Sequence, residues 1–176
     1  VTRALDEVIR AHPADVLPRL ALVNYLLGRN DAKAAVVAAQ GAVAALPDNN
    51  ILLERLGAAQ LASGTPEQAA ASFSKLSAAL PDRVEPLLRL AEAQAAAKDH
   101  AAAQRTLARA LELKPGLVQA RVASARIALA QARPEAALEI ARSLQRELPK
   151  QPIGYVLEAD VAGARGRGEP PASGRI

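Results

Sequence analysis

Small and apolar residues recur along the chain in step with a series of prolines. In residues 103–114, Ala103, Leu107 and Ala110 fall on one helical face, and Pro115 follows, where a proline cannot continue the helix. The same outline returns every thirty-four residues, and its closing prolines are Pro13, Pro47, Pro81, Pro115 and Pro149. A period in this range is typical of stacked helix pairs, so the pattern predicts an all-α repeat array.

The turn and capping residues predict where each repeat begins and ends. We expect an array over residues 1–164 and a tail over 165–176, whose glycines and prolines predict a flexible segment. Within the array we expect a half repeat formed by a helix at 1–12, full repeats at 16–49, 50–83, 84–117 and 118–151, and a lone helix at 152–164.

The two ends of the pattern are incomplete. The chain starts in the middle of a repeat, so we expect it to be a piece of a longer protein. At the other end, Pro170 and Pro171 stand where the partner of the last helix would run. We therefore expect that last helix to expose an apolar face through Ile153, Val156 and Leu157. This face would pack on the tail or on a second copy, which makes a homo-oligomer possible.

Composition narrows the possible partners of the chain. Apolar residues make up 51% of it, but it has only two tyrosines and one phenylalanine, and its formal net charge is +4. Nucleic acid binding is disfavoured because a basic face for single strands needs stacking aromatics. The longest apolar tract, residues 34–46, is too short to cross a bilayer, so we expect no transmembrane segment.

The sequence lacks the motifs that indicate metal binding, nucleophilic catalysis or phosphate binding. It has no cysteine, and neither His12 nor His100 has a second ligand at metal-binding spacing, so we expect no metal site. We find no nucleophile elbow and no phosphate-cradling glycine loop. Pairs such as Glu139 and Arg142 fit a solvated helix surface. We therefore expect a non-enzymatic protein with no catalytic residues and no cofactor.

The spacing of the small residues resembles that of tetratricopeptide repeats. That family prefers small residues at two positions of each repeat, and here these hold Val23, Gly57, Ala91, Ala125 and Ala159, and Ala35, Ala69, Ala103 and Ala137. Two helices joined by a tight turn must approach closely, and larger side chains would hold them apart. The family's bulky aromatics are mostly absent; Arg19 and Arg121, for example, occupy one of their positions.

This resemblance implies a right-handed superhelix of antiparallel helix pairs, an α-solenoid, with a concave groove lined by the first helix of each pair. The groove would bind a protein or peptide segment, because it is apolar with a few charges. A clamp for a C-terminal carboxylate is disfavoured, since Leu20 and Glu85 stand where that family's lysines are wanted. The candidate groove residues are Leu20, Asn24, Leu27, Glu54, Leu61, Leu88, Glu92 and Arg126.

Residues 139–160 are also similar to the tetratricopeptide lipoproteins of the bacterial PEP-CTERM, exosortase-linked export system. This second resemblance implies a scaffold in the periplasm or cell envelope that accompanies exopolysaccharide export; without it, a cytoplasmic location is expected. Two alternatives stay open. The chain could be a structural spacer with no ligand of its own, or an accessory of carbohydrate export, although the inner positions carry no aromatic platform for a sugar.

Overall fold

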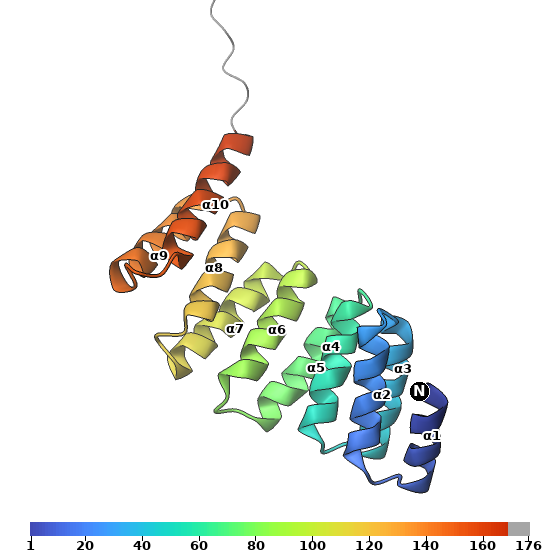
Figure 1. Ribbon diagram of the computed structural model, residues 1–176. Coiled ribbons are helices and arrows are strands. Elements are labelled where there is room, and N and C mark those ends of the chain that lie inside the picture. Colours follow the sequence, from blue (N-terminus) through green and yellow to red (C-terminus); the bar gives the residue numbers. More distant parts are fainter. Residues whose placement is uncertain (169–176) are drawn as a thin grey trace, which may run out of the picture. The chain divides into compact units, whose positions relative to one another are not determined.

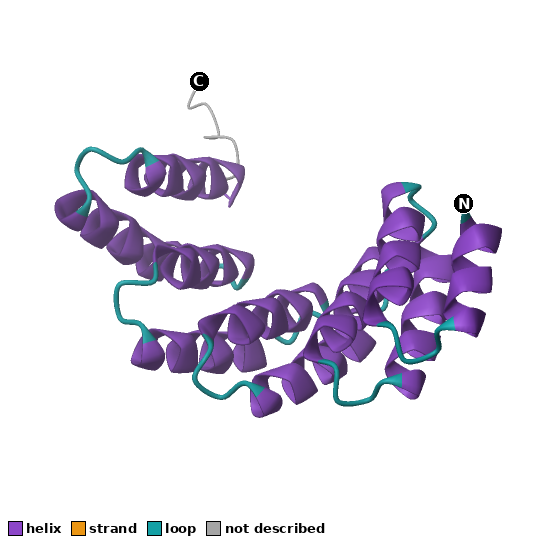
Figure 2. Ribbon diagram, turned by 60° about the horizontal axis from the view of Figure 1, so that its bottom comes forward, coloured by secondary structure: helices purple, strands orange, loops and turns teal. Residues whose placement is uncertain are grey.

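The computed structural model describes residues 1–168, which form ten α-helices and no strand, joined by short loops (Figures 1 and 2). This confirms the predicted all-α class. The helices are α1 (Thr2–Ala11), α2 (Val16–Gly28), α3 (Ala32–Ala45), α4 (Asn50–Ala62), α5 (Pro66–Ala79), α6 (Val84–Ala96), α7 (His100–Leu113), α8 (Val118–Ala130), α9 (Pro134–Glu147) and α10 (Ile153–Gly168).

The helices fall into two compact units, Val1–Asp99 and His100–Ile176. In the first unit each helix from α1 to α6 packs on the next, and α2 also packs on α4. In the second unit α7 packs on α8, α8 on α9 and α9 on α10.

Capping residues explain why the helices begin where they do. The carboxylates of Asp15 and Asp31 accept hydrogen bonds from the first-turn amides of α2 and α3, and the Asn49 side chain does the same for α4. Pro66 and Pro134 are the first residues of α5 and α9, where the missing N–H removes no helical hydrogen bond.

The turn inside each helix pair contains one residue with left-handed backbone geometry. These residues are thirty-four positions apart, with φ angles of 61° at Asn30, 77° at Gly64, 63° at Lys98 and 54° at Ala132. Glycine and asparagine adopt this geometry at low cost, whereas the β-carbon of alanine or lysine is crowded by the backbone. The repeat therefore imposes one backbone conformation on four different residue types.

Exchanging residues at two of these turns should change stability in opposite directions. Gly64→Ala should destabilise the fold and Ala132→Gly should stabilise it, each by on the order of 1 kcal/mol, because left-handed strain exceeds the extra chain entropy of glycine. Urea midpoints of the two variants test this. If both substitutions shift the urea midpoint in the same direction, the prediction is contradicted.

Small side chains allow close contact between helices throughout the core. Ala35, Ala69, Ala103 and Ala137 are all fully buried. A β-carbon added at Gly57 would lie 2.6 Å from the tip of the buried Phe73 ring, so the glycine of α4 admits the phenyl group of α5. Beside them the buried Ser72 donates a 2.7 Å hydrogen bond to the side-chain oxygen of Gln60. These contacts fix how α4 and α5 lie against each other.

Two expectations for the C-terminal helix were wrong. The helix α10 runs to Gly168 and so includes residues 165–168, which were predicted to belong to the tail. One reason is that Arg165 forms a 2.8 Å ion pair with Glu135 of α9, which favours the helical extension over an open turn. The remaining tail residues, 169–176, lie outside the described part of the chain.

The predicted exposed face of this helix is also different. Leu157 is only 1% exposed because it packs, together with Val161, into a core cluster that includes Ala141 and Leu144 of α9. Ile153 is half-buried, and of the three predicted residues only Val156 is exposed, beside Tyr155, the other large apolar side chain exposed on α10. The lone helix thus buries one apolar face within its own unit.

Gly154 sets how closely α10 approaches α9. An added β-carbon would lie 2.8 Å from the backbone nitrogen of Gln145 and 2.9 Å from the carbonyl oxygen of Ala141, neither of which can rotate away. Across the same contact the Gln145 side chain donates hydrogen bonds to the Gly154 carbonyl and to Glu158.

A pair of glycine substitutions in α10 tests this contact. Gly154→Ala should lower the melting temperature because the two helices must separate. Gly163→Ala is the matched control, since an added β-carbon there meets no atom within 4 Å and alanine is the better helix former. Melting followed by circular dichroism should show a fall for the first and no fall for the second. Equal melting temperatures would show that the approach is not tight.

Candidate functional site

The predicted groove residues lie on the first helix of each pair. Leu20, Asn24 and Leu27 are on α2, Glu54 and Leu61 on α4, and Leu88 and Glu92 on α6, all within the first unit. Arg126, on α8, belongs to the second unit. The side chains of Asn24, Glu92 and Arg126 are exposed, and the other five residues are half-buried.

Some of these leucines also contribute to the core. Leu27 packs against the buried cluster of Val23, Ala39 and Leu56. Leu61 packs against the cluster that contains Phe73 and Leu90. Substitutions of these two leucines would therefore change stability as well as the surface, whereas Asn24 and Glu92 can be changed at lower cost to the fold.

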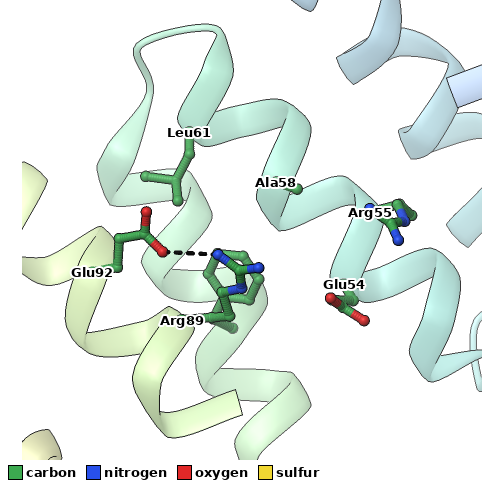
Figure 3. Close-up of a pocket in the computed structure, with 7 residues that line it drawn as sticks. Glu54, Arg55, Ala58, Leu61, Arg89 and Glu92 are labelled. Carbon is green, nitrogen blue, oxygen red and sulfur yellow. Dashed lines mark hydrogen bonds and ion pairs between the residues drawn. The ribbon is translucent and has the colours of Figure 1, made fainter. Parts of the chain in front are cut away.

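Three of the predicted residues, Glu54, Leu61 and Glu92, line one pocket of about 190 Å³ in the first unit (Figure 3). The other lining residues are Arg55 and Ala58 of α4, Phe73 of α5 and Arg89 of α6. In the close-up the side chains of Leu61, Arg89 and Glu92 converge between α4 and α6, and Glu54 lies nearby on α4. The pocket thus joins an apolar lining with four charged side chains.

The prediction omitted four residues of this pocket, for two different reasons. Arg55 and Ala58 lie on the same helix as Glu54 and Leu61; the family's inward-facing positions already include Ala58, although the candidate list leaves it out, and helical spacing could have added Arg55. Arg89 could have been found in the same way from Glu92. Phe73 comes from the second helix of its pair, and only the close approach at Gly57 brings its buried ring to the pocket.

The four charges of the pocket are not all paired with one another. Arg89 forms a 3.1 Å ion pair with Glu92, and both side chains are more than half exposed. Neither Glu54 nor Arg55 forms an ion pair with any residue in 1–168, and the buried Nε atom of Arg55 has no hydrogen-bond acceptor there. The Arg55 side chain as a whole is only half-buried, so its exposed part can still meet an incoming acceptor.

The remaining predicted residues do not line the pocket. Leu20, Asn24 and Leu27 are on α2, which packs beside α4. They extend the candidate surface beyond the pocket. Two apolar side chains at equivalent positions add to this surface: Leu17 on α2 is 70% exposed and Ile51 on α4 is 51% exposed. An apolar strip next to a mixed pocket suits a protein segment.

Residues 1–168 lack the features of a metal site and of a membrane-spanning helix. No group of three histidine, aspartate or glutamate side chains in this range could hold a metal ion. No helix in the same range combines the length and the hydropathy needed to span a membrane.

The second unit has a different electrostatic feature, an ion pair that joins α8 to α9. Arg121 occupies a position at which the resemblance to tetratricopeptide repeats implies a bulky aromatic, and its side chain is 15% exposed. It donates hydrogen bonds to both carboxylate oxygens of Glu147, at 2.6 and 3.0 Å, and to Ser143 at 2.7 Å. Ser143 in turn donates a 2.8 Å hydrogen bond to Glu147. The hydrogen bonds that Glu147 accepts, first from Arg121 and then from Ser143, lower its pKa below the ordinary value of 4.5.

This pair predicts a loss of stability in acid. The lowered pKa means that the unfolded state binds more protons at Glu147, so the contribution is complete above pH 4.5 and falls as the pH drops through the folded-state pKa. Glu147→Gln cannot titrate and should lose less stability than the wild type between neutral pH and a pH well below 4.5. Urea titrations at both pH values test this; an equal loss in the two proteins would contradict it.

The comparisons with known proteins agree with the helical geometry. The tetratricopeptide repeat family matches residues 60–116. No curated protein matches the sequence. Among solved structures, a tetratricopeptide repeat protein from Parabacteroides merdae has a TM-score of 0.81 at 20% identity over 94% of this chain. This chain spans only 66% of that protein's length.

Two further solved structures show the same likeness. A thermophilic tetratricopeptide protein of Thermus thermophilus has a TM-score of 0.65 at 20% identity, covering 93% of this chain and 88% of that one. YrrB, described as a tetratricopeptide protein with an unusual peptide-binding site, has a TM-score of 0.66 at 16% identity, covering 96% and 87%. The chain therefore carries a tetratricopeptide repeat match at residues 60–116 and has the α-solenoid fold of tetratricopeptide repeat proteins.

Proposed function

We propose that the protein is a non-enzymatic interaction scaffold whose first unit binds a segment of a partner protein across α2, α4 and α6. The observation that carries this proposal is the pocket of Glu54, Leu61 and Glu92, which combines apolar lining with unpaired charge on the surface of the first helices. The repeat match supports a protein partner, since this fold typically serves as an interaction scaffold. The peptide-binding site of YrrB, a structural neighbour, is consistent with this use of the fold.

The chemistry of the surface favours a peptide over a nucleic acid. The excess of basic over acidic residues lies entirely in residues 100–176, so the first unit has no net positive charge to attract phosphates. The apolar side chains of Leu17 and Ile51 instead offer hydrophobic contact to an extended or helical segment.

We further propose a location in the bacterial cell envelope, as part of an exopolysaccharide export system of the PEP-CTERM type. This proposal rests on the similarity of residues 139–160 to the lipoproteins of that system. Fractionation of cells that make the native full-length protein tests it. Recovery in the envelope fraction supports the proposal, and recovery in the cytoplasm alone contradicts it.

Peptides selected from a phage-displayed random library with the purified chain provide ligands for testing the binding surface. Asn24→Arg and Glu92→Lys should each weaken binding of these peptides about tenfold, because both side chains are exposed on the proposed surface. Glu67→Lys is the matched control, an exposed glutamate on α5 that does not line the pocket. Fluorescence anisotropy with labelled peptides gives the dissociation constants.

The opposite results would favour the spacer alternative. If the library yields no specific peptide, or if Glu67→Lys weakens binding as much as the two surface variants do, the first helices are not the binding site. A structural spacer would show changes in stability alone.

A further inference from the structure

We infer that the pocket between α4 and α6 is an anchor for one apolar side chain of the partner, of leucine or phenylalanine size, flanked in the partner by one acidic and one basic residue. This inference rests on the proposed function, since it names the partner chemistry that the same surface would select. Three properties of the pocket lead to it: its size, its apolar lining and its unpaired charges.

The volume of the pocket indicates whether it would bind one side chain of the partner or a complete small-molecule ligand. A cavity of about 150 Å³ is enough for a benzene molecule, whereas sites for drug-sized molecules and cofactors occupy roughly 300–1,000 Å³. At about 190 Å³ the pocket fits a phenyl or isobutyl group and is too small for an ordinary cofactor. A peptide backbone would therefore remain outside and insert a single residue.

The lining favours an apolar group at this place. Ala58 and Leu61 contribute apolar surface from α4, and the fully buried ring of Phe73 from α5 forms the floor beneath them. Arg89 and Glu92 satisfy each other through their 3.1 Å ion pair, so they need no charged partner. An apolar side chain would cover the buried cluster that Leu61 already packs against.

The unpaired charges specify the flanking residues. Glu54 and Arg55 are consecutive on α4 and half-buried, and neither has an ion-pair partner among residues 1–168. A segment with one charge of each sign can pair with the half-buried side chains of both residues. A segment of uniform charge would meet one like charge and leave one group unpaired.

A synthetic peptide array tests the pocket directly. The peptides hold a central leucine, phenylalanine, alanine or glycine between flanks of lysine and aspartate, of two lysines, or of two aspartates, and the labelled chain is the probe. Binding should be strongest for central leucine or phenylalanine with mixed flanks. Strongest binding by central glycine, or by uniformly charged flanks, would overturn the inference.

Variants of the protein separate the pocket from the rest of the surface. Ala58→Leu should fill the pocket and weaken the best array peptide about tenfold or more. Ala71→Leu, on an exposed position of α5 outside the pocket, is the control and should leave binding unchanged. Circular dichroism checks that both variants remain folded.

A charge swap gives a second readout that does not depend on filling the pocket. Arg55→Glu should weaken the mixed-flank peptide, and replacing that peptide's aspartate by lysine should restore binding to the variant. Unchanged binding by Arg55→Glu, or no restoration, would overturn the proposed charge pairing. If Asn24→Arg weakens binding while Ala58→Leu does not, the pocket inference fails and the proposed function stands. If neither substitution weakens binding, the pocket inference and the proposed function both fail.

Discussion

The close approach of neighbouring helices is the constraint on which the structure depends. It requires small residues at fixed steps, and Ala35, Ala69, Ala103 and Ala137 meet this requirement with fully buried side chains. At two contacts even alanine is too large: Gly57 admits the Phe73 ring, and Gly154 brings α10 against the backbone of α9. Because interiors are close-packed, one added methyl group at such a point must displace a helix or a ring.

The same constraint shapes the candidate site. The buried ring of Phe73, from the second helix of a pair, comes close enough to form the floor of a pocket between two first helices. The small side chains that allow this close approach of helices leave few large apolar groups to fill the space between the first helices. Charged residues therefore line a surface that an aromatic-rich repeat would pack more fully, and two of them, Glu54 and Arg55, are left without ion-pair partners in the described range.

The sequence predicted the helical class and the register of the helices well, because both follow from a local pattern of small residues and prolines. It predicted the site only in part. Glu54, Leu61 and Glu92 share the pocket, but Phe73 joins it through a tertiary contact that no spacing reveals. The exposure of Leu157 was mispredicted for a similar reason: helical periodicity shows which face is apolar, whereas the contact at Gly154 decides what covers it.

Hydrogen exchange of the first unit, with and without a peptide that binds it, is the most direct test of the central claim that the first helices form the binding surface. The account predicts slower amide exchange on binding in α4 and α6, which flank the pocket, and in the neighbouring α2. Slower exchange confined to the second helices, α3 and α5, would contradict it, because a partner would then occupy the opposite face of the helix pairs.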